Sequence, residues 1–277
     1  DNSQLAMHNA VPLAVKFDPT KVDPTVYPYK YAVTPVQVAT AYNLPPGDGY
    51  GGCVGLLELT YSGYVAGYNT TDVNNSFTRI GLTPPTVVDV LVDGATRSTT
   101  SDAETMLDIY CACGVAPKAT IAVYMGPNSL QGFADAILAA SADTVNKPMS
   151  LGISWGLTEF GTTYLSSALQ ACIAVGCTPF AASGDSGAAG MTCLYPASDP
   201  YVVASGGTSI YLNNDNTLNN ETAWSGTGGG VSAYSALPAH QVGLTSQTII
   251  NGVVGTPTTL PRPNNTRSNK DSLFSIQ

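Results

Sequence analysis

The sequence predicts an α/β fold in which a parallel β-sheet is covered by helices on both of its faces. Short apolar runs of strand length alternate along the chain with longer segments in which apolar residues recur at helical spacing. Most of the short runs are apolar almost throughout, as strands are when both faces of a sheet are buried. Strands with one face in water would instead alternate between apolar and polar residues.

The expected elements follow one another along the chain. Ser101 stands three residues before Glu104, a pattern that caps the first turn of a helix, and Gly176 stands where a helix commonly ends. Ligand sites in such sheets lie beyond the carboxyl ends of the strands, so the stretches around Trp155 and Asp185 are candidate site positions. The expected strands are 53–59, 86–92, 120–126, 149–155, 178–184 and 201–207, and the expected helices between them are 101–114, 130–142 and 162–176.

Length and composition describe a globular protein that is long enough for one large domain or for two smaller ones. The 277 residues are 44% hydrophobic and only 10% charged, which is enough apolar material for a core. We see no apolar run of membrane-spanning length and no charged-then-apolar signal pattern at the start, so any signal or pro-segment is expected to have been removed. The net charge of −9 disfavours nucleic acid as a partner, because its phosphates would be repelled.

Glycosylation sequons and cysteines indicate secretion. An even number of cysteines, here six, is expected of a disulfide-bonded protein from an oxidising compartment, although buried free thiols fit the sequence as well. The cysteine spacing lacks the repeated C-x-x-C of a zinc site, so structural metal binding by cysteine is not expected. Asn-x-Ser/Thr sequons lie in loop-like stretches at Asn69, Asn74, Asn220 and Asn264.

The stretch "FAASGDSGAAG" (180–190) contains letters that surround an active residue in three kinds of peptidase. A chymotrypsin-like serine peptidase needs a histidine base, but only His8 and His240 occur, and both lie in loop-like segments that contain proline. An aspartic peptidase needs a second Asp-Thr/Ser-Gly, which the sequence lacks. Both architectures are all-β and contradict the predicted alternation. The remaining interpretation makes Asp185 the working group and assigns the role of base to another carboxylate.

A pair of carboxylates meets that requirement. Glu104 and Asp108 are four residues apart in a predicted helix, so both project from the same helix face. Two like charges at this spacing repel each other, so helix stability does not account for them. A solvated acidic helix face is the alternative interpretation.

Several stretches, in this order and spacing, resemble the sedolisin family of serine-carboxyl peptidases. The resemblance covers Tyr31 to Gln241 and implies a subtilisin-like fold. It predicts a peptidase domain over 31–241, which leaves an N-terminal extension over 1–30. The polar residues after Gln241, with Pro, Asn and Thr scattered among them, predict a hairpin or loop and then a mobile tail over 242–277. The matching stretches are "VTPVQVATAYNLP", "CVGLLELTYSGY", "AETMLDI", "GVAPKATIAVYMG", "SLGISWGLTEFG", "FAASGDSG", "YPASDPYVVASGGTSIY" and "AWSGTGGGVSAYSALPAHQ".

The resemblance implies a role for each carboxyl residue. Glu104 falls on the general base, Asp108 on the aspartate that orients it, and Asp185 on the aspartate of the oxyanion hole, which leaves Ser186 as a turn residue. A carboxylic acid donates a hydrogen bond to an oxyanion only while it is protonated, and the ordinary pKa values of Asp and Glu are about 3.9 and about 4.3. We therefore expect peptide-bond hydrolysis through an acyl-enzyme at acidic pH, in a secreted or lysosome-like setting.

The stretch "GISWG" resembles the family's strand that pairs with an extended peptide substrate. Backbone groups of Ser154 and Gly156 would bond the peptide, whereas Trp155 either walls a side-chain pocket or belongs to the core. Glu159 and Trp224 resemble positions near the cleft without a defined role. The glycines of "GTGGGVS" allow close backbone packing, and the absence of a following lysine argues against a phosphate site.

The family's nucleophile motif, Ser/Gly-Gly-Thr-Ser-x-x-x-Pro, is not matched. "SGGTSIYLN" (205–213) contains Ser209, but no proline follows at the expected place, and Ser209 runs into an apolar strand-like stretch. The family's Pro-Asp-Val-Ser segment and its aspartate-rich calcium-binding region are also not found. The family thus implies calcium, but no metal ligand is expected in these residues.

We therefore expect the nucleophilic serine on a separate light chain that covers the apolar sheet of this one. A truncated sample and a catalytically inactive, peptide-binding relative are the alternatives. A glycoside hydrolase that uses Glu104 and Asp108 ranks last, because carboxylates on adjacent turns of one helix rarely face a sugar from opposite sides.

Overall fold

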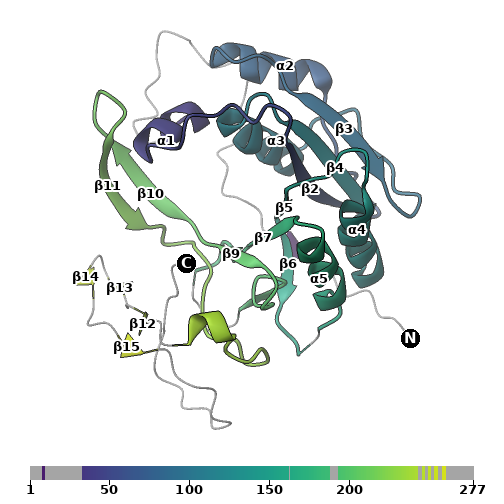
Figure 1. The fold of residues 1–277 in the computed structure, drawn as a ribbon, viewed down its shortest axis with the longest axis vertical. Coiled ribbons are helices and arrows are strands. Elements are labelled where there is room, and N and C mark those ends of the chain that lie inside the picture. The colour runs from purple at the N-terminus through teal and green to yellow at the C-terminus, as the bar shows by residue number, and fades with distance from the viewer. Residues whose placement is uncertain are drawn as a thin grey trace.

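The computed structural model describes residues 33–161, 163–187 and 193–242, together with residues 8–9 and four two-residue strands between 245 and 259 (Figure 1). Its centre is a six-stranded sheet in the order β3–β4–β2–β5–β7–β9, with all neighbouring strands parallel. The predicted α/β fold is confirmed. The strands are β2 (Cys53–Thr60), β3 (Thr86–Leu91), β4 (Thr120–Pro127), β5 (Ser150–Ile153), β7 (Thr178–Ala182) and β9 (Val203–Ser205).

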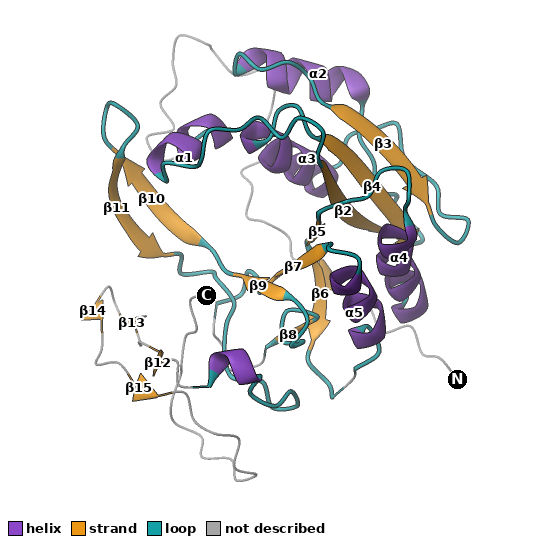
Figure 2. Ribbon diagram, in the orientation of Figure 1, coloured by secondary structure: helices purple, strands orange, loops and turns teal. Residues whose placement is uncertain are grey.

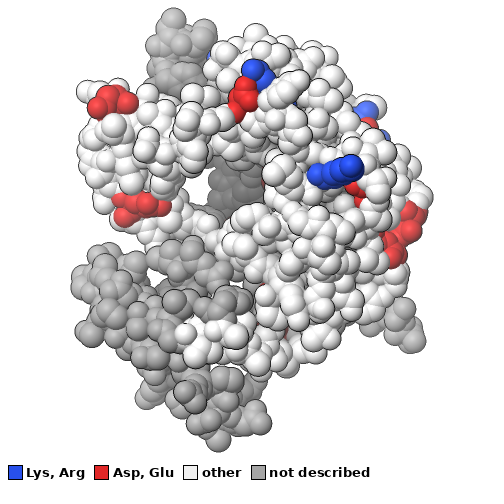
Figure 3. Space-filling view, in the orientation of Figure 1, with Lys and Arg blue, Asp and Glu red and all other residues white. Residues whose placement is uncertain are grey.

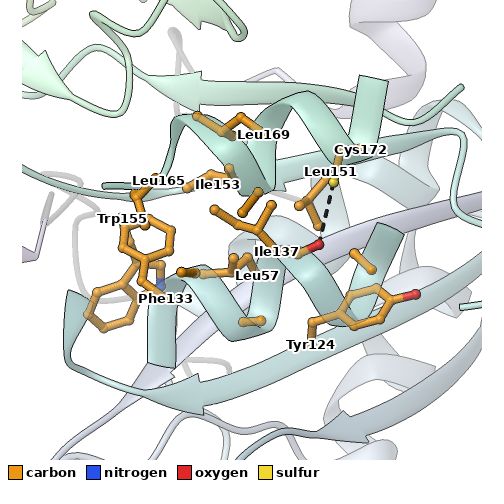
Figure 4. Close-up of a cluster of buried hydrophobic side chains, with 14 of the residues drawn as sticks. Leu57, Tyr124, Phe133, Ile137, Leu151, Ile153, Trp155, Leu165, Leu169 and Cys172 are labelled. Carbon is orange, nitrogen blue, oxygen red and sulfur yellow. Dashed lines mark hydrogen bonds between the residues drawn. The ribbon is translucent and has the colours of Figure 1, made fainter. Parts of the chain in front are cut away.

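Helices cover both faces of this sheet (Figure 2). Alternate side chains of each central strand enter different cores, because successive residues of a strand point to opposite faces. Tyr124 of β4 packs with Phe133 and Leu169 on one face, and its neighbour Val123 packs with Phe77 and Ile109 on the other. Figure 4 shows the first of these clusters. The helices are α2 (Thr70–Arg79) and α3 (Ala103–Val115) on one face, and α4 (Leu130–Ala142) and α5 (Ser166–Ala174) on the other.

The N-termini of two helices show which side chains cap them. Helix α1 (Pro35–Ala41) begins with a capping box, in which the Thr34 side chain accepts from the Gln37 N–H and the Gln37 side chain accepts from the Thr34 N–H. The expected Ser101 cap of α3 is wrong. Asp102 caps that helix instead, because its carboxylate accepts from the Thr105 N–H at 3.0 Å, and Ser101 donates to Asp72 at 2.7 Å.

The run predicted as one strand at 149–155 is interrupted at Ser154. The strand that begins after this residue, β6 (Trp155–Thr158), leaves the main sheet and pairs antiparallel with β8 (Leu194–Tyr195) and with β1 (His8–Asn9). The residue at the division is therefore free to direct its side chain toward α3 instead of into a ladder.

An antiparallel hairpin of β10 (Thr208–Leu212) and β11 (Leu218–Ala223) extends from the body of the protein toward α1 (Figure 1). Hydrogen bonds from the Tyr42 hydroxyl to Glu221 at 2.6 Å and from Gln37 to Asn216 at 2.9 Å tie it to α1 and its following turn. The face drawn in Figure 3 carries few charged side chains and is hollowed between this hairpin and the sheet.

The last described residues are a single turn, η1 (Ala239–Gln241), and two nested strand pairs. Most of the expected N-terminal extension and tail lies outside the described residues. None of the described helices has the length and apolarity needed to cross a membrane. The strand pairs join β12 (Thr245–Ser246) to β15 (Thr258–Thr259) and β13 (Ile249–Ile250) to β14 (Val253–Val254).

All six cysteines lie in the described residues and are free thiols, so the expected disulfides are not formed. Cys172 and Cys177 contact each other at the end of α5, where Gly176 adopts the left-handed conformation of a helix end. Among the predicted glycosylation positions, Asn69 caps α2 by accepting from the Thr71 N–H at 2.8 Å. Asn74 and Asn220 are exposed, and Asn264 lies outside the described residues.

Candidate active site

The carboxyl residues singled out from the sequence come together near the carboxyl ends of the parallel strands. Glu104 and Asp108 project from α3, and Asp185 lies in the loop that follows β7. The charges of Asp108 and Asp185 both act on Glu104 and raise its pKa. The fold therefore joins residues that are about 80 positions apart in the chain into one electrostatic site.

Glu104 titrates far from its ordinary range. Burial is the main cause that raises its pKa to about 8, and the Asp108 charge adds to it, while a hydrogen bond from Ser154 opposes the shift. Glu104 is consequently protonated throughout the acidic range unless a further hydrogen-bond donor stabilises its ionised form.

Asp108 is held by a serine from the neighbouring strand. The Ser154 hydroxyl lies 2.9 Å from each of the two carboxylate oxygens of Asp108, to which it donates. Burial raises the pKa of Asp108 to about 6, although the Ser154 hydrogen bond works in the opposite direction. Ser154 thus contacts both acids of α3 through its side chain, whereas the sequence analysis had considered only its backbone, as a partner for a peptide substrate.

Asp185 is half-buried in the segment that follows β7, and burial raises its pKa. The residue before it, Gly184, has φ +110°, a conformation that residues with a side chain rarely adopt. Ser186 is exposed, as expected of a turn residue. A raised pKa favours the protonated, hydrogen-bond-donating form of Asp185 in acid.

The sequence analysis missed a fourth acid, Glu58, in the middle of β2. Its side chain is 0% exposed, and one carboxyl oxygen accepts from the indole N–H of Trp155 at 3.1 Å. The other oxygen has no hydrogen-bond partner among the described residues. Burial, and then the charge of Asp108, hold the Glu58 pKa well above its usual range, so we assign it a proton. A single glutamate in the otherwise apolar run "CVGLLEL" was the available signal.

Asp102 fixes the start of α3 and therefore the position of Glu104. Its carboxylate accepts from the Tyr64 hydroxyl at 2.9 Å, the Gly67 N–H at 2.5 Å, and both the N–H and hydroxyl of Thr105 at 3.0 and 2.8 Å. The Tyr64 ring in turn packs edge-on against Trp155, with ring centroids 5.8 Å apart. The acidic cluster is thereby fastened to the core.

The structure decides between the two interpretations of Trp155. Its side chain is 1% exposed and packs in the core, so the indole does not wall an open pocket in the described part of the chain. The backbone at Trp155 and Gly156 pairs with residues 8–9 as an antiparallel ladder, with Gly156 opposite His8 and Trp155 opposite Asn9. This edge of β6 therefore accepts an extended segment.

The other positions singled out from the sequence lie on different elements from the acids. Ser209 is in β10, where it pairs with Thr222 across the hairpin. Glu159 directly follows β6, and Trp224 directly follows β11, where its N–H donates to the Gly207 carbonyl at 3.0 Å. Within the described ranges, no group of three or more His, Cys, Asp or Glu side chains could hold a metal ion.

The sequence comparison gives the class of this α/β protein: the chain belongs to the sedolisin family of serine-carboxyl peptidases. It is 39% identical to kumamolisin of Bacillus sp. (strain MN-32) over 233 residues, which are 76% of this chain and 41% of that protein. It is 30% identical to tripeptidyl-peptidase sed5 of Aspergillus fumigatus over 202 residues, which are 61% of this chain and 35% of that protein.

A solved structure agrees at the level of the fold. Pseudomonas sedolisin, a serine-carboxyl proteinase complexed with two molecules of pseudo-iodotyrostatin, superposes with a TM-score of 0.66 at 22% identity, over 76% of this chain and 66% of that one. No family model matches the chain. The chain spans less than half the length of the two curated relatives it matches.

Proposed function

We propose that this chain is the larger part of an acid-acting serine-carboxyl endopeptidase that hydrolyses peptide bonds through an acyl-enzyme. The observation that carries the proposal is that the pKa values of Glu104, Asp108 and Asp185 are all raised, chiefly by burial, and that the charges of Asp108 and Asp185 add to the shift of Glu104. Perturbed carboxyl groups that share a site are typical of acid–base catalysis. The identity to kumamolisin supports the same conclusion.

In this proposal Glu104 is the general base and Asp108 orients it. A serine hydroxyl that donates to Glu104 would favour the ionised carboxylate, as the Ser154 hydrogen bond already does, and would lower the pKa of Glu104 toward the acidic range. Glu104 would then take the proton of that hydroxyl as it attacks the peptide carbonyl, and return a proton to the leaving amine.

Asp185 is proposed to stabilise the oxyanion. A neutral carboxyl donates a hydrogen bond to the negative charge that develops on the carbonyl oxygen, which a carboxylate would repel. The raised pKa of Asp185 supports this role, because it widens the acidic range in which the group is protonated. Ionisation of Asp185 would end catalysis as the pH rises.

The peptide substrate is proposed to lie along β6. The antiparallel pairing of residues 8–9 with Gly156 and Trp155 supports this position, since it demonstrates that the β6 edge bonds an extended backbone. We further propose that the nucleophilic serine belongs to a light chain. Among the described strands β9 pairs with β7 alone, and its Val203 is 37% exposed, which leaves an edge that a partner strand can extend.

The same β6 pairing favours one alternative, a sedolisin-like protein that binds peptides without cleaving them. Treating the purified full-length protein with a serine-directed phosphonofluoridate, followed by intact mass and peptide mapping, separates the two. A label on a serine of a companion polypeptide, together with acid peptidase activity that Glu104→Gln abolishes and Asp72→Asn leaves intact, supports the enzyme. A label on Ser154 would refute the light-chain proposal, and absence of both label and turnover would favour the binding protein.

A further inference from the structure

Two loops lie against each other beside the acidic site. We name residues 183–187 the Asp185 loop and residues 224–235 the glycine-rich loop. Their backbones are joined by hydrogen bonds from the Gly228 N–H to the Gly184 carbonyl at 2.7 Å and from the Gly187 N–H to the Gly226 carbonyl at 2.8 Å. Asp185 therefore lies in a segment that is tied on both sides to the glycine-rich loop.

Gly228 makes the contact so close that no other residue fits. A Cβ atom placed there would lie 1.9 Å from the carbonyl oxygen of Ser183 and 2.5 Å from its carbon. Both neighbours are backbone atoms, so the two loops would have to separate to admit even a methyl group. The Ser183 hydroxyl adds a third link by donating to the Gly228 carbonyl at 2.9 Å.

Glu159 fastens the far end of the glycine-rich loop. This residue follows β6 directly and is only 8% exposed. One of its carboxylate oxygens accepts from the Ser232 hydroxyl, and the other accepts from the Ala233 N–H at 3.1 Å. The Ser232 oxygen itself accepts from the N–H groups of Tyr234 and Ser235 at 3.1 and 2.6 Å, which fixes the turn.

These contacts form a continuous path from the β6 strand to Asp185. We infer that Glu159 and Gly228 are positioning residues for Asp185: Glu159 anchors the glycine-rich loop to the end of β6, and Gly228 lets that loop hold the Asp185 loop in place. The inference rests on the proposed function, because it assigns Asp185 to the reaction. It also explains why a buried carboxylate follows the proposed substrate strand, since the same strand would then align both the peptide and the oxyanion donor.

The test uses the full-length protein with three variants. Gly228→Ala separates the loops, Glu159→Gln removes one of the two anchoring acceptors while keeping the shape, and Gly47→Ala is the matched control because a Cβ at Gly47 meets nothing within 4 Å. Two quantities are measured: kcat and KM at acidic pH, and the titration of the Asp185 carboxyl by carbon-13 NMR.

We expect Gly228→Ala to lower kcat about a hundredfold with little change in KM, because a shift of about 1 Å in a reacting group has an effect of that size. Glu159→Gln should lower kcat less, and Gly47→Ala should match the unmodified protein. The Asp185 titration should move toward its ordinary acidic position in Gly228→Ala and Glu159→Gln, since a released loop exposes the carboxyl to water.

The inference is overturned if Gly228→Ala and Glu159→Gln keep the kcat and the Asp185 titration of the Gly47→Ala control. If Gly228→Ala does not fold, judged by circular dichroism, Glu159→Gln decides the question alone. If the unmodified protein shows no turnover, the proposed function fails, but the NMR titration still tests whether the two residues position Asp185.

Discussion

Raising the pH from about 4 to about 8 should destabilise this protein, which is the reverse of ordinary acid denaturation. The reason is the direction of the carboxyl pKa shifts. Glu104 has a pKa of about 8 in the fold against an ordinary 4.5, and Asp108 has a pKa of about 6 against 3.8. Folding therefore favours the protonated acids. The contribution of these protonated acids to the stability of the fold is fully present below about pH 4 and is lost as the pH rises through their folded pKa values.

The shifts set an upper limit to the effect. One pKa unit corresponds to about 1.4 kcal/mol, so Glu104 alone gives at most about 5 kcal/mol and Asp108 at most about 3 kcal/mol. The two acids share a hydrogen-bond partner and titrate together, so these limits do not add. Partial access of water to Glu104 reduces its share further. We expect a net loss of about 3 kcal/mol between pH 4 and pH 8, against a total stability of about 5–15 kcal/mol.

Urea unfolding at a series of pH values measures this loss. Glu104→Gln should flatten the pH dependence, because a neutral amide replaces the acid that must otherwise ionise inside the protein. Asp72→Asn, at an exposed carboxyl in the first turn of α2, should leave the dependence unchanged. The reasoning is refuted if stability is highest near neutral pH and falls in acid, or if Glu104→Gln keeps the slope of the unmodified protein.

Three further predictions concern neighbouring residues. Glu58→Gln should cost less than about 1 kcal/mol in urea unfolding, because its amide oxygen still accepts from the indole, whereas Trp155→Phe should cost about 1–3 kcal/mol by leaving a buried acid without a partner; equal losses would contradict this. Asp102→Ala should lower the free energy of unfolding by about 1–2 kcal/mol through the missing helix cap, and it should also lower kcat because the first turn of α3 carries Glu104. An unchanged kcat would show that the cap does not position Glu104 for the reaction. Ser209→Ala should retain full peptidase activity in the full-length protein, and loss of activity would make Ser209 the nucleophile after all.

The parallel sheet and its main helices could be predicted because they carry strong periodic signals. Residues 130–142 form α4 with the predicted bounds, since buried apolar residues recur along one face. Helix α2 was missed because only Val73 and Phe77 of its ten residues are buried in an otherwise polar segment. The β10–β11 hairpin was missed because β11 has no buried residue to mark it.

The sequence likewise predicted some features of the candidate site and not others. The spacing of Glu104 and Asp108 was sufficient to place both on one helix face, and the strand that ends before Asp185 was sufficient to place it at the same edge of the sheet. The pKa values were beyond reach, because they depend on burial and on charges supplied by other elements. Glu58 was overlooked because its strand reads as core, and its partner, the Trp155 indole, is about 100 residues away in the chain.

The pH dependence of kcat/KM for Asp185→Asn, measured in the full-length protein against the unmodified enzyme, tests the central claim most directly. Asparagine donates a hydrogen bond at every pH, so the account predicts that this variant keeps measurable turnover and remains active at higher pH, where ionised Asp185 would stop the reaction. A variant whose activity declines over the same pH range as the unmodified enzyme would show that protonated Asp185 does not serve the reaction.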